Sequence, residues 1–217
     1  MILGHIPTND EDCLDDFSQR FKALSERYQH VIRGFYFGHT HKEETAVNRG
    51  FNDQSPLQVF WTTGSVTTET GKNPSFRIFE LDAETMLPVK IDKYYFNISR
   101  ANEFNEPLWH FMYEFTEEYD LPDLSPSSIL NLAERIKSDE QLAVKYLKNL
   151  HALGPDSDAH TSCDQECRSN LYCDMVSGHY YGYKDCIGAS HIDFLNDPGA
   201  LFVVLADPWI EGPKPFD

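Results

Sequence analysis

The sequence predicts an α/β protein of the layered α+β type, with strands in its first half and helices in its second half. Four runs rich in β-branched and aromatic residues, at 32–37, 57–62, 76–81 and 89–98, predict strands, and turn residues separate the last three of them. Beyond residue 107 the apolar residues recur at helical spacing instead. Hydrophobic residues make up 41% of the 217 residues, which is sufficient for a packed core.

An amphipathic helix is expected before the first of these strands. Phe17, Phe21, Leu24, Tyr28 and Val31 recur at intervals of three and four residues, and acidic residues precede them, as is typical of a first helical turn. We expect the apolar face of this helix to form part of the core.

Three further helical stripes are expected in the second half of the chain. They consist of Leu108, Phe111, Met112 and Phe115, then Ile129, Leu132, Ala133 and Ile136, and then Leu142, Tyr146, Leu147 and Leu150. The turn at 121–126 carries Ser125 and Pro126, a pair typical of a helix start, so it is expected to cap the second of these helices.

The charge of the chain limits its partners. It carries 18 basic and 35 acidic side chains, a net charge of −17. A surface of this sign repels nucleic-acid phosphates, so binding to nucleic acid polymers is not expected. No apolar stretch approaches the roughly 20 residues that span a bilayer, and the N-terminus lacks the basic start and long apolar centre of a signal peptide.

The cysteines, by contrast, favour an oxidising compartment. Cys163, Cys167, Cys173 and Cys186 lie close together in a loop-rich region, which favours two local disulfides, although a zinc site of four thiolates is an alternative. Cys13 is left over, and an odd cysteine in an oxidised protein suggests a partner elsewhere, here in sequence outside this chain. The sequon at 97–99 predicts glycosylation of Asn97, which agrees with a secretory route.

The histidines suggest a metal site. His39 and His41 follow directly on an apolar strand, in the segment GHTH at 38–41, and neutral imidazole is the commonest ligand for zinc-like ions. Two histidines one residue apart are also compatible with an ordinary surface or core pair. His5, beside a glycine at the end of a short apolar run, supplies a third nitrogen, and three histidines could complete a catalytic zinc site. The others, His30, His110, His151, His160, His179 and His191, are expected to be solvated or packed rather than to bind metal.

These segments resemble the acid sphingomyelinase branch of the calcineurin-like metallophosphoesterases. The segments GHIP at 4–7 and GHTH at 38–41 are similar to the last two metal motifs of that branch, in the same order. The resemblance continues through 73–79 and 94–99 and ends in the cysteine spacing, so that it covers about residues 1 to 187.

The resemblance implies an architecture. Residues 1–106 would form the C-terminal half of an αββα metallophosphoesterase sandwich, 107–187 a disulfide-stapled helical subdomain, and 188–217 a tail of unknown structure. It implies that Cys163 pairs with Cys167 and Cys173 with Cys186. It also implies that Cys13 pairs upstream.

The resemblance further implies two divalent metal ions, expected to be zinc, with His5 and His39 on one ion and His41 on the other. In the family the remaining ligands and the general acid precede the GHIP segment, so no catalytic residue is expected within this chain.

Three functions are compatible with these features. The first is hydrolysis of a phosphodiester, sphingomyelin to ceramide and phosphocholine, by a full-length protein outside the cell or in the lysosome. The second is the same chemistry on nucleotides or other small phosphodiesters. The third is a non-catalytic truncated isoform or binding module that keeps an incomplete metal site. The sequence does not specify an oligomeric state.

Overall fold

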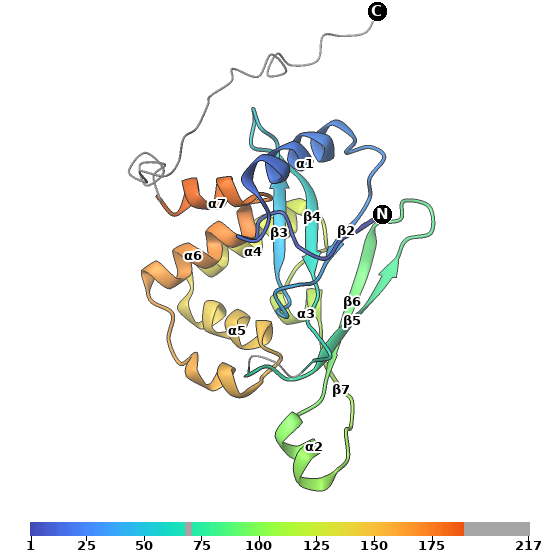
Figure 1. The fold of residues 1–217 in the computed structure, drawn as a ribbon, viewed down its shortest axis with the longest axis vertical. Coiled ribbons are helices and arrows are strands. Elements are labelled where there is room, and N and C mark those ends of the chain that lie inside the picture. The colour runs from blue at the N-terminus through green and yellow to red at the C-terminus, as the bar shows by residue number, and fades with distance from the viewer. Residues whose placement is uncertain (68–70, 189–217) are drawn as a thin grey trace, which may run out of the picture.

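The computed structural model describes residues 1–67 and 71–188 (Figure 1). Its first sheet has four strands. Strands β1 (Ile2–Leu3), β2 (Phe35–Phe37), β3 (Thr45–Arg49) and β4 (Pro56–Thr62) have the spatial order β1-β2-β4-β3. The first two pairs of neighbours are parallel and β3 is antiparallel to β4. The expected strand at 57–62 is confirmed, the one at 32–37 is shorter than expected, and β3 had no counterpart in the predictions.

The second sheet is antiparallel and has three strands. Strands β5 (Ser75–Leu81), β6 (Pro88–Tyr95) and β7 (His110–Glu114) lie in this order. The first two confirm the strands expected at 76–81 and 89–98, although β6 ends at Tyr95.

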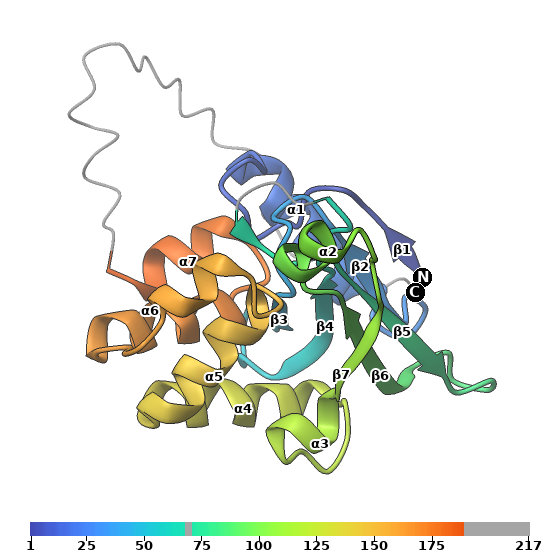
Figure 2. The same cartoon turned by 90° about the horizontal axis from the view of Figure 1, so that it is seen from below.

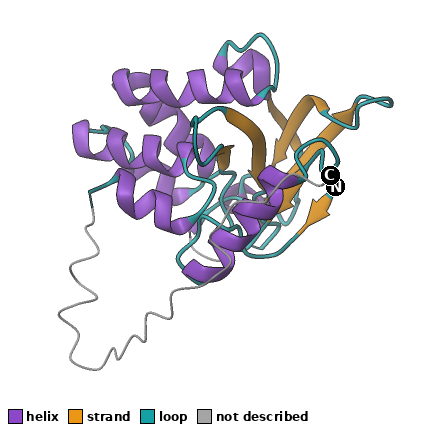
Figure 3. Ribbon diagram, turned by 90° about the horizontal axis from the view of Figure 1, so that it is seen from above, coloured by secondary structure: helices purple, strands orange, loops and turns teal. Residues whose placement is uncertain are grey.

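Helices lie on both faces of the first sheet (Figures 2 and 3). They are α1 (Asp15–Arg27), α2 (Ile98–Phe104), α3 (Phe115–Tyr119), α4 (Pro126–Ser138), α5 (Glu140–Leu150), the 3-10 helix η2 (Pro155–Ala159), α6 (Gln165–Val176) and α7 (Tyr180–Cys186). The expected cap of α4 is present, because the Ser125 side chain accepts a hydrogen bond from the Ser128 N–H and Pro126 is the first helical residue. Helix α4 packs on β3 and β4, and α6 packs on β3.

The two sheets face each other. Tyr36 and Trp61 of the first sheet contact Phe79 of the second, with ring centroids 5.1 and 6.0 Å apart, and this interior continues between α4, α5 and α6. On the opposite face of the first sheet, Phe35 and Phe60 pack against Phe21 of α1. Helix, sheet and sheet are therefore stacked as layers, and the α/β fold class is confirmed.

The expected helix around residue 111 is wrong. Residues 110–114 form β7, in which Tyr113 is opposite Lys93 of β6 and is buried, whereas Phe111 is opposite Tyr94 and is 54% exposed. The register shifts between Lys93 and Tyr94, so apolar side chains in β7 do not alternate strictly. A bulged strand with irregular alternation is hard to distinguish from a short helical pattern.

The apolar face of α1 is also not where the sequence predicted it. The helix buries Ser18, Lys22 and Ser25, and it leaves Phe17 61% and Leu24 52% exposed. Burial of the serines costs little because their hydroxyls donate to carbonyl oxygens of the same helix, at 2.9 Å and 2.8 Å.

Two disulfides stabilise the C-terminal helices. Cys163 is bonded to Cys167 and Cys173 to Cys186, which confirms the disulfides and leaves no thiolates among these four for a zinc site. Cys13 is a half-buried free thiol on the loop before α1. Burial and the nearby Asp10 raise the pKa of this thiol.

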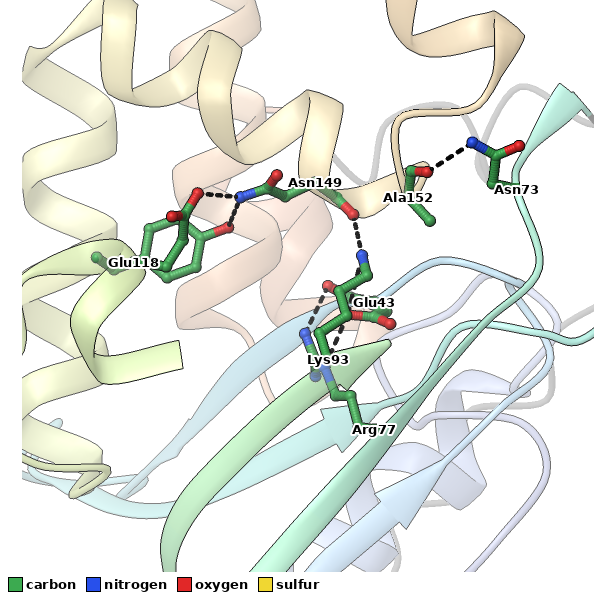
Figure 4. A network of polar contacts seen from close by, with 8 residues as sticks. Glu43, Asn73, Arg77, Lys93, Glu118, Asn149 and Ala152 are labelled. Atoms are coloured by element: carbon green, nitrogen blue, oxygen red, sulfur yellow. Dashed lines mark hydrogen bonds and ion pairs between the residues drawn. The ribbon is translucent and has the colours of Figure 1, made fainter. Parts of the chain in front are cut away.

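A buried ionic network joins the layers (Figure 4). The Glu43 carboxylate lies 2.8 Å from Arg77 Nε and 3.1 Å from Lys93 Nζ, and all three side chains are at most 1% exposed. Lys93 also donates to the Asn149 carbonyl oxygen at the end of α5. The network thus links the loop before β3 to the second sheet and to the helices.

The turn after α5 is held by one side chain. Ala152 and Leu153 have positive φ angles of 49° and 52°, which are strained for residues with a β-carbon. The Asn73 amide donates to both of their carbonyl oxygens, at 3.0 and 2.9 Å, and its oxygen accepts from the Ile98 N–H.

His151 and His160 stack beside this turn and are only partly exposed, rather than freely solvated. Their ring centroids are 5.0 Å apart, and Nδ1 of His151 lies 3.2 Å from Nε2 of His160. Burial and the neighbouring His160 lower the pKa of His151 to about 4.

Replacing Glu43 should destabilise the fold strongly. Glu43→Gln leaves Arg77 and Lys93 buried without a counter-charge, so we expect the free energy of unfolding to fall by about 3–5 kcal/mol. Urea denaturation measures this change. Glu80→Gln is the control, because Glu80 pairs with Lys90 at the surface, and it should have little effect. Equal stability of Glu43→Gln and the wild type would contradict a structural role for the network.

Acidification should destabilise the fold through His151. Between pH 6.5 and about 4 the unfolded chain binds a proton that the folded chain excludes, so the free energy of unfolding falls as pH falls through this window. We expect His151 to account for on the order of 1–2 kcal/mol of this loss, since partial solvent access screens the repulsion. Denaturation at several pH values should give a shallower slope for His151→Asn, whereas His30→Asn, at an exposed site, should match the wild type. An unchanged slope in His151→Asn would exclude this explanation.

Candidate metal centre

Parallel pairing of β1 and β2 brings two of the predicted ligands together. Leu3 is opposite Tyr36, and the pairing continues past the strand ends, because the Gly4 N–H donates to the Tyr36 carbonyl at 3.0 Å and the Gly38 N–H donates to the His5 carbonyl at 2.9 Å. The two segments therefore leave the sheet side by side, at the carboxyl ends of the two parallel strands. His5 and residues 38–41 lie at these strand ends.

The imidazoles of His5 and His39 meet directly. Nε2 of His5 lies 3.3 Å from Nδ1 of His39, and the ring centroids are 5.1 Å apart. On its other side, Nε2 of His39 lies 2.7 Å from an oxygen of Asp12 and 3.9 Å from an oxygen of Asp10. The two rings and two carboxylates form one cluster, which is partly open to solvent.

The carboxylates of this cluster were not predicted from the sequence. Asp10 and Asp12 lie in the acidic segment between His5 and α1, where nothing in the residue pattern separates a ligand from a solvated charge. The structure shows that the loop turns back, since the Asp12 N–H donates to the Asp10 carboxylate at 2.9 Å. This turn places both side chains near His39.

His41 is not part of the contact. Its ring makes no hydrogen bond, ion pair or ring contact within residues 1–67 and 71–188, and it is partly exposed. The backbone at both histidines of the GHTH segment is unusual, with φ of 74° at His39 and 58° at His41. Positive φ at residues with a β-carbon costs energy and is concentrated at functional sites.

The donor set fits one divalent ion of the zinc type. One ligand atom each from Asp10, Asp12 and His39 lies within 4.8 Å of the other two. His5 lies at Nδ1 of His39, on the side of the ring away from the carboxylates, so it is not part of this group. Nitrogen and carboxylate donors together suit zinc and similar ions. His41 belongs to no group of three or more potential ligands among the described residues.

A small cavity of about 80 Å³ adjoins the cluster. Asp10, Glu44, Thr45 and Asp174 are among the residues that line it. Burial of the Asp174 carboxyl group raises its pKa, and the negative charge of the nearby Glu44 raises it further. Part of the Asp174 residue is nevertheless exposed to solvent. This acidic environment favours a cation or a proton next to the histidines.

The remaining predicted site residues lie elsewhere. Asn97 is exposed at the start of α2, where its side-chain oxygen caps the helix by accepting from the Arg100 N–H at 2.9 Å. His179 is buried rather than solvated, at 8% exposure. His191 lies outside the described residues.

Comparison with known proteins identifies relatives of the chain. Residues 57–193 match the family model described as the acid sphingomyelin phosphodiesterase C-terminal region. The matched residues begin after the three predicted histidine ligands. Among curated proteins, sphingomyelin phosphodiesterase B of Dictyostelium discoideum is 32% identical over 86% of this chain and 30% of its own length. The sphingomyelin phosphodiesterase of Bos taurus is 31% identical over 81% of this chain and 28% of its own length. A cyclic GMP-AMP phosphodiesterase of Rattus norvegicus is 27% identical over 86% of this chain and 44% of its own length. The chain thus spans about a third of the sphingomyelin phosphodiesterases that it matches.

Proposed function

Because the chain belongs to the acid sphingomyelin phosphodiesterase family, we propose that it supplies one side of a metal-dependent phosphodiesterase centre. The observation that carries this proposal is the contact of His5 and His39 at the edge of the first sheet, with Asp12 on the outer nitrogen of His39. A strained backbone and two flanking carboxylates are not expected around a pair of surface histidines without a function.

We assign the chain's residues as follows. His5 and His39 bind one ion, His41 binds a second, and both ions are expected to be zinc. Bound metal of this kind lowers the pKa of a bound water and neutralises charge on the phosphoryl oxygens. In this assignment Asp12 accepts a hydrogen bond from Nε2 of His39 and fixes the ring orientation, and Nδ1, which faces His5, is the nitrogen that binds the ion. The other ligands and the general acid are proposed to come from the part of the relatives that this chain does not span.

Two substrate classes are supported by the relatives. Sphingomyelin is the first, because several similar proteins are named as sphingomyelin phosphodiesterases. A cyclic dinucleotide is the second, because other relatives are named as cyclic GMP-AMP phosphodiesterases. Hydrolysis of sphingomyelin, the first of these substrates, would release ceramide and phosphocholine.

An extracellular or lysosomal location accompanies this proposal. The two disulfides require an oxidising environment to form and persist. The exposed Asn97 sequon adds a glycan site on the same route. No helix among the described residues is long and apolar enough to cross a membrane.

Metal binding tests the assignment of the ligands. We expect the chain to bind one zinc ion, because the described residues contain one group of three potential ligands, and this group includes His39. Calorimetric titration with zinc should show His39→Ala weakening binding about 100-fold, since an essential ligand is lost. His30→Ala removes an exposed histidine far from the cluster and should bind as the wild type does. Two tightly bound ions per chain would contradict the view that the second site is incomplete.

Turnover in the complete gene product tests the reaction. Zinc-dependent hydrolysis of sphingomyelin and of cyclic GMP-AMP should be measured side by side, with release of phosphocholine or nucleotide as the readout. His41→Ala should lower the rate by about 100-fold or more, because the ion that it holds would be lost. Absence of turnover of either substrate in the loaded protein would favour the non-catalytic alternative.

A further inference from the structure

A second pocket lies away from the predicted metal ligands, between α1, the turn after β3 and the segment that joins α6 to α7. Its volume is about 600 Å³, within the range of pockets that hold small organic molecules. Lys22, Arg49, Phe51, Tyr172, His179 and Tyr181 are among the lining residues, and Asp185 is the one carboxylate among them. None of the proposed metal ligands lines this pocket.

Lys22 is a largely buried cation that is in direct contact with no carboxylate in the described part of the chain. It is 6% exposed, and its ammonium makes no hydrogen bond or ion pair within the described part of the chain. The ammonium lies over the face of the Phe51 ring, 4.3 Å from the ring centroid. Glu26, one helical turn away, instead accepts from the Phe51 N–H at 3.1 Å. Burial lowers the pKa of Lys22, and Arg49 lowers it further while Glu26 opposes the shift.

Arg49 adds a second cation to the same wall. Its Nε donates to the Gln54 carbonyl at 3.0 Å, which holds the guanidinium at the pocket. Two neighbouring cations that repel each other are unusual in a chain with a net charge of −17. An anion bound between them would relieve the repulsion and the cost of burying Lys22.

His179 offers a polar atom that also lacks a partner. The residue is 92% buried, at 8% exposure, and its Nδ1 is buried with no hydrogen bond. The ring lies between Phe51 and Tyr181, each with its centroid 6.3 Å away, and is nearly parallel to Tyr181. Burial and Lys22 lower the pKa of His179 to about 4, so near neutral pH the ring is uncharged and can donate one N–H.

We propose that this pocket binds a small molecule in which a phosphate or phosphonate group is attached to a flat ring. The oxyanion lies against Lys22 and Arg49, next to the ring of His179, and the two cations match an acceptor with several oxygens. The flat ring lies against the aromatic side chains of Phe51 and Tyr181. This site is independent of the metal centre and of the reaction proposed for it.

Phenylphosphonate is a suitable probe because its carbon–phosphorus bond is not a phosphodiester. Calorimetric titration of the full chain, with a chelator present to prevent binding through metal ions, should show saturable binding. Inorganic phosphate should bind at least about tenfold more weakly, since it lacks the ring, and benzyl alcohol should not bind, since it lacks the charge.

Variants locate the site and separate binding from folding. Lys22→Met should weaken phenylphosphonate at least tenfold, yet it should unfold at the same or a higher temperature because an unpaired buried charge is removed. Arg20→Gln removes an exposed cation from the same helix and should bind as the wild type does. The His179 ring nitrogens, followed by NMR, should shift on binding in the wild type only.

Two results would overturn the proposal. One is the absence of saturable phenylphosphonate binding to the wild type. The other is binding to Lys22→Met that equals the wild type, which would place the ligand elsewhere.

Discussion

The arrangement of this chain depends on the buried carboxylate of Glu43. Charges without access to water are tolerated only when they are paired, and this carboxylate pairs with Arg77 of β5 and Lys93 of β6. Glu43 lies two residues after His41, so the end of the histidine loop is tied to the second sheet. Because Lys93 also reaches the end of α5, the helical layer is held to the same point.

This constraint explains how the loop can hold a strained backbone. Positive φ angles at His39 and His41 would relax in a free loop. Here the segment begins at Gly38, which hydrogen-bonds to His5, and ends at the Glu43 network, so both ends are fixed. The orientation of the imidazoles therefore follows from contacts outside the site. A metal centre built on such a loop is preorganised by the sheets rather than by its own residues.

The sequence predicts the features that depend on local pattern. Strands β4 and β5 and helices α4 and α5 have regular periods, and the disulfides follow from family spacing. The features that sequence reasoning missed depend on pairing across the fold. Strand β7 has its alternation interrupted by a register shift against β6, and Asp12 reaches His39 only because β1 and β2 are parallel. Neither the register shift nor the parallel pairing of β1 and β2 can be recognised from the order of the residues in the sequence.

Helix α1 shows why a correct helix can still have its faces assigned wrongly. Hydrophobic periodicity identifies the apolar stripe, but the face of the helix that is buried carries Ser18, Lys22 and Ser25, and Phe17 faces outward. Only Phe21 enters the aromatic core. The next residue, Lys22, is directed to the pocket beside Phe51 instead. One helix therefore forms a wall of the core and a wall of the pocket, and the polar side chains that it buries follow from this double role.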